Sequence, residues 1–131
     1  MAVEVARLSK IPLFDELSED QRSSLASWLD EEETKAGRVV TYEGASGYAF
    51  FVIEEGEARV MHGDEELRRL GPGDFFGEAA ILGDGRRTAD VVAETDLELL
   101  AMFGTRFRVL QMEMPELAAM IEATMRERLD R

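Results

Sequence analysis

The stretch Phe75–Val91 reads FFGEAAILGDGRRTADV, and the rest of the chain is interpreted outward from it. A run of small and apolar residues after Gly77 predicts a short helix, whose first N–H groups have no partner inside the helix. Such a helix end attracts anions, because the free N–H groups and the helix dipole both present positive charge. Arg87 can add a planar fork of donors that suits a phosphate, whereas Glu78 is an acceptor that suits a hydroxyl. The stretch therefore describes a site for a sugar phosphate.

The same stretch resembles the phosphate-binding cassette of cyclic nucleotide-binding domains. The usual form of that cassette is close to F-G-E-L-A-L-L, then a variable loop, then P-R-A/T-A-T-V. The chain departs from it at Ala79, at Arg86 where proline is usual, and at Asp90 where a neutral polar residue is usual. It matches at Phe76, Gly77, Glu78, Ala80, Ile81, Leu82, Arg87, Thr88, Ala89 and Val91. F-G-E followed by R-T-A at this spacing is a specific signal.

The resemblance implies roles for two charged residues. Arg87 would hold the exocyclic oxygens of a cyclic phosphate, and Glu78 would accept a hydrogen bond from the ribose 2'-hydroxyl. The alternative for Arg87 is an ion pair with Glu78 or Asp90, and the alternative for Glu78 is an acid that only favours the helix dipole. If Asp90 faced the pocket, it would repel the phosphate and weaken or abolish binding. Arg86 is expected to point away from its neighbour, as alternate strand residues do.

Small residues complete the predicted ligand set. Gly77 permits a close approach of the backbone to the ligand. The resemblance implies that Ala79, Ala80 and Ala89 act through their backbone amides. The Thr88 hydroxyl can bond the phosphate or, in a syn nucleotide, the 2-amino group of guanine, so it does not separate cAMP from cGMP.

Composition bounds the class of protein. A length of 131 residues suits one domain with its own core, and 45% hydrophobic with 33% charged residues is typical of a soluble globular chain. The absence of cysteine excludes disulfides and thiolate metal sites, and no metal is expected. Met1–Lys10 has neither the basic start nor the apolar run of a signal peptide, and no segment is long enough to span a membrane, so a cytoplasmic protein is expected. A net charge of -13 argues against binding of nucleic acid or an acidic membrane by this chain alone.

The segment before the cassette changes from a helical to a β pattern. The first ten residues predict a short helix, and Ser18–Gln21 is a capping box for the next one. The acidic run Asp30–Glu33 predicts a solvated turn. The helix after the capping box has apolar residues at helical spacing, at Leu25, Trp28 and Leu29. Ile11–Phe14 is predicted to be a short apolar segment with an extended backbone.

Short segments rich in β-branched and aromatic residues follow, with turn signals every 8–12 residues, as in an all-β sandwich or barrel. The predicted strands are 37–42, 48–53, 57–61, 65–70, 88–93 and 97–103. The predicted barrel core includes four aromatic residues, Tyr42, Tyr48, Phe50 and Phe51. The order also resembles the family, through I-P-L-F from Ile11, F-V-I-x-x-G from Phe51, and L-G-P-G-D-F-F-G-E from Leu70.

The chain is expected to end in two helices. Gly104-Thr105 can cap the first, and Pro115 interrupts it or starts the second. The resemblance implies that the final helix is a lid over the base, although ordinary packing explains the same pattern. The candidate lid residues are Met125 and Leu129 as apolar contacts and Arg126 and Arg128 as polar ones.

The fold predicted for the chain is mainly β with flanking helices: an eight-stranded β-roll of the jelly-roll type, a short phosphate-binding helix, N-terminal helices and two C-terminal helices. Residues 1–131 are expected to be one cyclic nucleotide-binding domain, with a helical segment at 1–33, the roll at 34–103 with the cassette at 75–91, and the C-terminal helices at 104–131.

The predicted function is a non-enzymatic sensor that binds cAMP in preference to cGMP and signals to an unknown protein through its C-terminal helices. The alternative is a non-binding domain of the same fold, used for protein contact or for homodimerisation through its last helix. A third reading is a transcription regulator that lacks its DNA-reading half. An enzyme of the double-stranded β-helix type would need several histidine ligands, and the chain has only His62.

Overall fold

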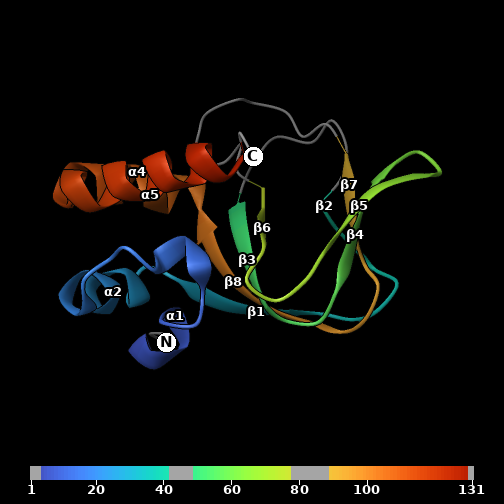
Figure 1. Ribbon diagram of the computed structural model, residues 1–131, viewed down its shortest axis with the longest axis horizontal. Helices are drawn as coiled ribbons and strands as arrows, with labels where there is room; N and C mark the ends of the chain where they lie inside the picture. Colours follow the sequence, from blue (N-terminus) through green and yellow to red (C-terminus); the bar gives the residue numbers. More distant parts are fainter. Residues whose placement is uncertain (1–3, 42–48, 78–88, 130–131) are drawn as a thin grey trace.

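The computed structural model describes residues 4–41, 49–77 and 89–129, and the side chains of Thr41, Arg128 and Leu129 are not among those described. Within these ranges, eight strands form two four-stranded antiparallel sheets that face each other as a roll (Figure 1). Sheet A has the order β1-β8-β3-β6, and sheet B has the order β2-β7-β4-β5. The predicted β-roll with flanking helices is confirmed.

Sheet A contains the two longest strands. Its members are β1 (Asp30–Thr34), β8 (Leu97–Phe103), β3 (Ala49–Glu55) and β6 (Phe75–Phe76). Sheet B contains β2 (Val39–Thr41), β7 (Asp90–Ala93), β4 (Ala58–His62) and β5 (Glu65–Leu70).

The helices gather on one side of the roll, against sheet A (Figure 1). They are α1 (Val5–Leu8), the 3₁₀ turn η1 (Pro12–Phe14), α2 (Glu19–Ala26), α4 (Gly104–Glu113) and α5 (Pro115–Leu129). We call this group the helical layer. No helix in the described ranges is long and apolar enough to cross a membrane.

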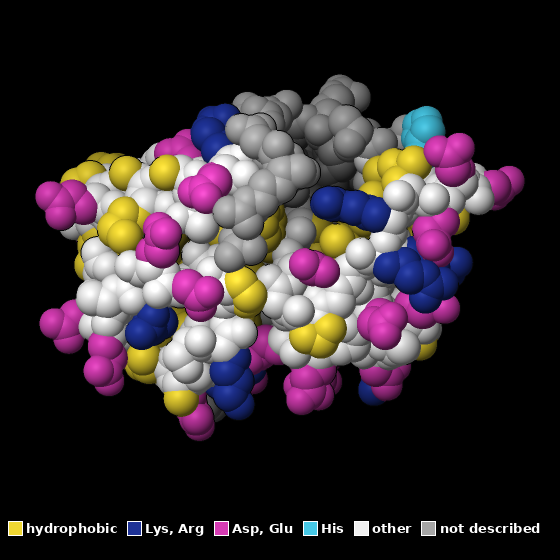
Figure 2. Space-filling view, in the orientation of Figure 1, with side chains coloured by type: hydrophobic (Ala, Val, Ile, Leu, Met, Phe, Trp, Pro, Cys, Tyr) yellow, Lys and Arg dark blue, Asp and Glu magenta, His cyan; other side chains and the backbone are white. Residues whose placement is uncertain are grey.

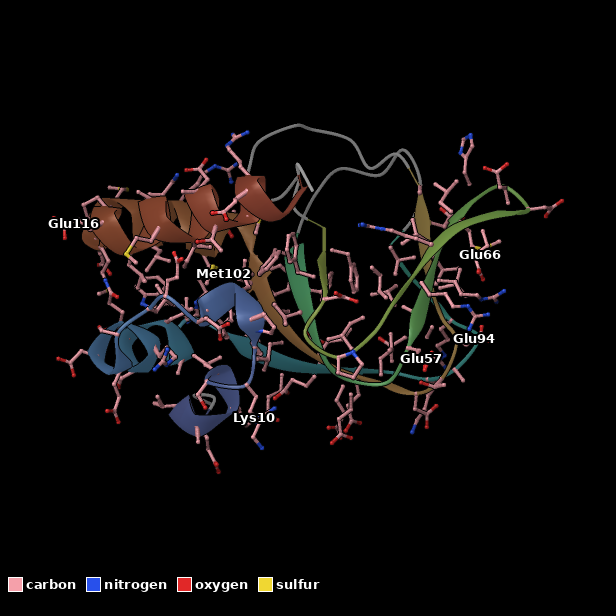
Figure 3. The ribbon with its side chains drawn as sticks, viewed as in Figure 1. Lys10, Glu57, Glu66, Glu94, Met102 and Glu116 are labelled. Carbon is pink, nitrogen blue, oxygen red and sulfur yellow. The ribbon has the colours of Figure 1, made fainter. Side chains whose placement is uncertain are left out.

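Alternation along β8 gives sheet A two apolar faces. Leu97 and Leu99 point into the roll, whereas Leu100 and Met102 point outward to the helical layer, and Met102 is seen between the sheet and the helices in Figure 3. The roll interior is filled by Ile53, Ala58, Leu70, Phe76, Val91, Ala93, Leu97 and Leu99. The second core joins sheet A to the helices and includes Leu8, Leu25, Leu29, Phe50, Val52, Leu100, Met102, Phe107, Leu110, Leu117, Ile121 and Met125.

Two predicted helix boundaries are confirmed. Ser18 accepts a hydrogen bond from the backbone N–H of Gln21, whose side chain accepts in return from the Ser18 backbone, which is the predicted capping box. The final helix begins at Pro115, where a missing backbone N–H costs nothing. The cap predicted at Gly104-Thr105 is wrong: Phe103 is the N-cap residue, and no side chain caps this helix.

The acidic run predicted as a solvated turn is instead strand β1. Asp30–Thr34 pairs antiparallel with β8, from Asp30 opposite Ala101 to Thr34 opposite Leu97. The strand lies at the edge of its sheet, where charged side chains can stay in water while the backbone pairs on one side. Glutamates therefore do not prevent this strand from forming.

Two details of β3 also differ from the prediction. Phe50 is buried, but it faces the helical layer and not the barrel core, because it alternates with Phe51, which packs against the roll interior. The strand continues through Glu54 and Glu55 in place of ending at Ile53. The predicted core positions Tyr42 and Tyr48 lie outside the described residues.

Candidate functional site

The chain enters the predicted cassette through a turn that is tied firmly to β3. The Gly73 N–H donates to the Ile53 carbonyl at 2.8 Å, and the Ile53 N–H donates to the Asp74 carbonyl at 2.9 Å. The Asp74 carboxylate also accepts from the Gly71 N–H at 2.7 Å. The L-G-P-G-D motif thus forms a closed turn that fixes where the next strand begins.

The strand after this turn delivers Gly77 to the cassette. In β6, Phe76 pairs with Phe51 of β3 and stacks on its ring, with centroids 5.1 Å apart and an angle of 22° between the planes. Phe76 is buried, so the end of this strand is anchored in the roll interior. Gly77 follows with φ +78°, a left-handed conformation that side-chain-bearing residues rarely adopt. The glycine of F-G-E is therefore required by backbone geometry.

The chain leaves the cassette through Ala89 into β7. Ala89 is half-buried, and β7 is held on both sides, by β2 and by β4. Asp90 is also half-buried and lies opposite Met61, while Val91 is buried in the roll interior. Both ends of the cassette are thus fixed to strands of the roll, one in each sheet.

The structure describes some of the predicted site residues. Gly77 and Ala89 frame the cassette at its two ends. The residues between them, and the short helix predicted there, lie outside the described residues; these include the predicted ligand residues Glu78, Ala79, Ala80, Arg87 and Thr88. Their roles remain predictions from the motif.

The candidate lid residues of α5 lie in two different environments. Met125 has 0% exposure and belongs to the core of the helical layer. Arg126 is exposed and lies 3.9 Å from Glu122 on the same helix. Contact between Met125 and a base would therefore require α5 to move or turn, and the side chains of Arg128 and Leu129 are not described.

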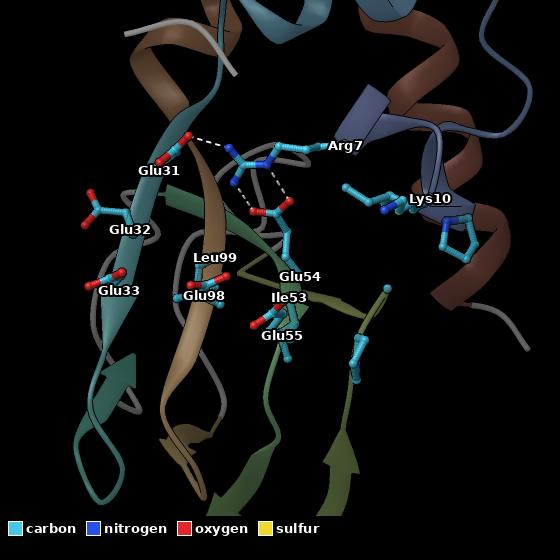
Figure 4. Close-up of a pocket in the computed structure, with 14 residues that line it drawn as sticks. Arg7, Lys10, Glu31, Glu32, Glu33, Ile53, Glu54, Glu55, Glu98 and Leu99 are labelled. Carbon is cyan, nitrogen blue, oxygen red and sulfur yellow. Dashed lines mark hydrogen bonds and ion pairs between the residues drawn. The ribbon is translucent and has the colours of Figure 1, made fainter. Parts of the chain in front are cut away.

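A pocket of about 640 Å³ lies elsewhere, where the outer face of sheet A extends beyond the helices (Figure 4). We call this part of the sheet the acidic half; it comprises Glu31, Glu33, Glu54, Glu55 and Glu98. The Arg7 guanidinium reaches into it from α1 and binds Glu54 and Glu31. Because the other carboxylates would repel a phosphate, this pocket does not suit a nucleotide.

Sequence reasoning did not find this acidic half. Three of its glutamates come from separate strands, Glu31 from β1, Glu54 from β3 and Glu98 from β8. The signal in the sequence was a charged residue at an outward position of each strand, but the pairing of the strands was needed to bring them together. Acidic side chains are also scattered over the helices and the roll on the face seen in Figure 2.

A family comparison matches most of the described roll. The model of the cyclic nucleotide-binding domain matches residues 31–113. The chain is 33% identical over 103 residues to a cAMP-dependent protein kinase regulatory subunit from Hypocrea atroviridis, covering 79% of this chain and 22% of that protein. It is 40% identical over 93 residues to a cGMP-dependent protein kinase from Caenorhabditis elegans, covering 66% of this chain and 12% of that protein.

Among solved structures, the regulatory subunit of a cAMP-independent protein kinase A from Trypanosoma brucei superposes with a TM-score of 0.84 at 23% identity, over 97% of this chain and 44% of that one. This likeness concerns the fold. The chain spans about a quarter or less of the length of the two sequence relatives described above, so it corresponds to one module of those larger proteins. The roll, the framed cassette and the family match agree: this chain belongs to the cyclic nucleotide-binding domain family.

Proposed function

We propose that the chain is a sensor module that binds a cyclic nucleotide, cAMP in preference to cGMP, at the cassette between Gly77 and Ala89. The observation that carries this proposal is that strands of the roll hold the cassette at both of its ends. Gly77 has the left-handed backbone conformation that opens the motif, and β6 and β7 hold the two ends in opposite sheets. Because strands of the roll hold both ends, the place where the cassette begins and the place where it ends are fixed relative to each other, which favours a defined ligand site.

The residues proposed to hold the ligand divide by its chemistry. Arg87 would bind the cyclic phosphate through its planar fork, and Glu78 would accept from the ribose hydroxyl. Backbone amides of Ala79, Ala80 and Ala89 would complete the phosphate contacts. Charge-assisted hydrogen bonds of this kind contribute roughly 1.5–3 kcal/mol each, so two of them with the ribose contact support micromolar affinity.

The preference for cAMP is the finer part of the proposal. The relatives include one kinase regulatory subunit named for cAMP and one kinase named for cGMP, so family membership leaves the ligand open. Thr88 could bond the guanine 2-amino group of cGMP. Calorimetric titration with both nucleotides tests the preference, and tighter binding of cGMP would overturn it.

Signalling is proposed to run through α5. A ligand favours whichever arrangement of the helices binds it better, so nucleotide binding would shift the helical layer toward a state in which α5 covers the base. Met125 would have to leave the core that it occupies in the described structure. A changed rate of hydrogen exchange in the segment 115–125 on addition of cAMP would support such a rearrangement, whereas unchanged exchange there would contradict it.

A second candidate function is a non-binding domain that acts in protein contact or dimerisation. Asp90 favours it, because this half-buried acidic residue stands near the end of the cassette, where the family usually has a neutral residue. The fold also occurs in the regulatory subunit of a protein kinase A that is described as cAMP-independent. If millimolar cAMP and cGMP both fail to raise the melting temperature, the second candidate replaces the first.

A further inference from the structure

We propose that Arg7 is an ionic latch that fastens the helical layer to the roll, and that its strength regulates the affinity of the cassette for its nucleotide. The first half of this proposal concerns contacts within the described structure. The second half rests on the proposed function, because it needs a nucleotide that binds at the cassette and a helical layer that rearranges.

The latch joins one helix to two strands. The Arg7 Nε donates to one Glu54 oxygen at 2.9 Å, and a terminal nitrogen of the same guanidinium donates to the other oxygen, which is a two-pronged contact. The second terminal nitrogen binds Glu31 (Figure 4). A single side chain of α1 is therefore bound to β3 and to β1 at the same time.

The next residue, Leu8, packs α1 against the rest of the helical layer. Leu8 has 0% exposure and packs in the core of the helical layer, whereas Arg7 points to the outer face of sheet A. A helix as short as α1, Val5–Leu8, is not stable by itself, so such tertiary contacts must determine its position. Leu8 thus joins α1 to the helices, and Arg7 joins it to sheet A.

Packed contacts continue from α1 to the candidate lid helix. Leu8 and Met125 are members of one buried cluster, and η1, which follows α1, packs directly against α5. The Gln21 amide of α2 also lies 3.4 Å from the Met120 sulfur of α5. A displacement of α5 would therefore strain the N-terminal helices, and the latch opposes that displacement because it holds α1 on the sheet.

Loss of the Arg7 charge would be unfavourable, because the pocket around it is lined by several carboxylates. The pocket at the latch also contains Glu33, Glu55 and Glu98, with Lys10 as the other cation. Without Arg7, the carboxylate of Glu54, which is only 14% exposed, would remain beside these like charges. Because Arg7 and Glu54 are partly shielded from water, salt should weaken the latch less than it weakens a surface pair.

The first test measures the latch without any nucleotide. Arg7→Gln and Glu54→Gln should each speed hydrogen exchange in the segment 4–11, by about threefold or more, and the double variant should add little to either single change. Arg69→Gln is the matched control, because it removes an arginine whose partners, Glu66 in β5 and Glu94 after β7, both lie on the roll and not on the helices. Unchanged exchange in both single variants, or fully additive effects, would overturn the latch.

The second test adds cAMP. Because the latch favours the arrangement in which Met125 stays in the helical core, Arg7→Gln should raise the affinity for cAMP, by about threefold or more, while Arg69→Gln should leave it unchanged. If the wild-type protein binds cAMP but Arg7→Gln binds it with equal or lower affinity, the regulatory half of the proposal fails. If the wild-type protein binds neither cAMP nor cGMP, the proposed function fails and the regulatory half fails with it, whereas the exchange test still decides whether the latch exists.

Discussion

Leu100 and Glu98 lie two residues apart on β8 and point from the same face of sheet A, yet Leu100 has 0% exposure and Glu98 is exposed to water. The same contrast divides the whole outer face. Where the helices cover it, the side chains are apolar (Phe50, Val52, Leu100, Met102), and we call this the helix-covered half. Beyond the helices lies the acidic half, where one arginine from α1 faces several glutamates.

The difference shows that two kinds of interaction hold the helices on one face of a sheet. Burial of apolar area holds the helical layer on the helix-covered half, and this force has no direction or charge dependence. The acidic half contributes an ion pair whose strength depends on charge state and geometry. Substitutions in the two halves should therefore differ in the size of their effect on stability and in its dependence on pH.

The largest effect is expected in the helix-covered half. Leu100→Ala removes a completely buried side chain from the contact between sheet and helices, and it should lower the free energy of unfolding by about 2–5 kcal/mol. Denaturant unfolding measures this loss. Leu67→Ala is the control, because Leu67 is half exposed and its truncation should cost much less. Equal losses for the two variants would contradict the division of the face.

An intermediate effect is expected at the latch. Arg7→Gln should lower the free energy of unfolding by about 1–2 kcal/mol, because a partly shielded, two-pronged ion pair is lost and Glu54 stays beside other carboxylates. Glu54→Gln should cost less than Arg7→Gln, since it removes one of the repelling charges together with the pair. A stability of Arg7→Gln equal to that of the wild type would show that the pair contributes nothing.

The smallest effect, with the opposite sign, is expected at Glu98. Repulsion by Glu55, some burial, and the charges of Glu33 and Glu54 raise the pKa of the Glu98 carboxyl above its ordinary value. A carboxyl whose pKa is raised in the folded state binds its proton more readily there, so stability falls as the pH rises from the ordinary value through the raised one. At about pH 7, Glu98→Gln should therefore raise the melting temperature slightly.

The pH dependence supplies the control for this substitution. Well below the ordinary glutamate pKa, near pH 3, wild-type Glu98 is already protonated and the gain should disappear. A gain that persists unchanged at low pH would mean that repulsion is not its cause.

The fold was predictable because its signals are local. The capping box at Ser18 and the helix start at Pro115 depend on residues close in the chain, and both were predicted correctly. Strand β1 was not predicted, because a run of glutamates becomes a strand only through pairing with β8, about seventy residues later along the chain. Phe50 was assigned to the wrong core, because alternation alone does not tell which face of a strand meets the helices.

The candidate site was predictable only as a motif. The glycine of F-G-E carries a backbone requirement that can be inferred from the sequence, and the structure gives Gly77 the corresponding positive φ. The roles of Glu78 and Arg87 were inferred from resemblance and await measurement. Arg7 could not have been predicted, since its partners lie on two strands that meet only in the folded sheet.

The most direct test of the central claim is a calorimetric titration of cAMP into the wild-type protein and into Arg87→Ala. A cassette that binds the cyclic phosphate through Arg87 predicts micromolar affinity for the wild type and a loss of about tenfold or more in the variant, from the removal of a charge-assisted contact. Glu78→Ala should weaken binding to a similar extent through the ribose. Equal affinity of Arg87→Ala and the wild type would contradict the proposed mechanism.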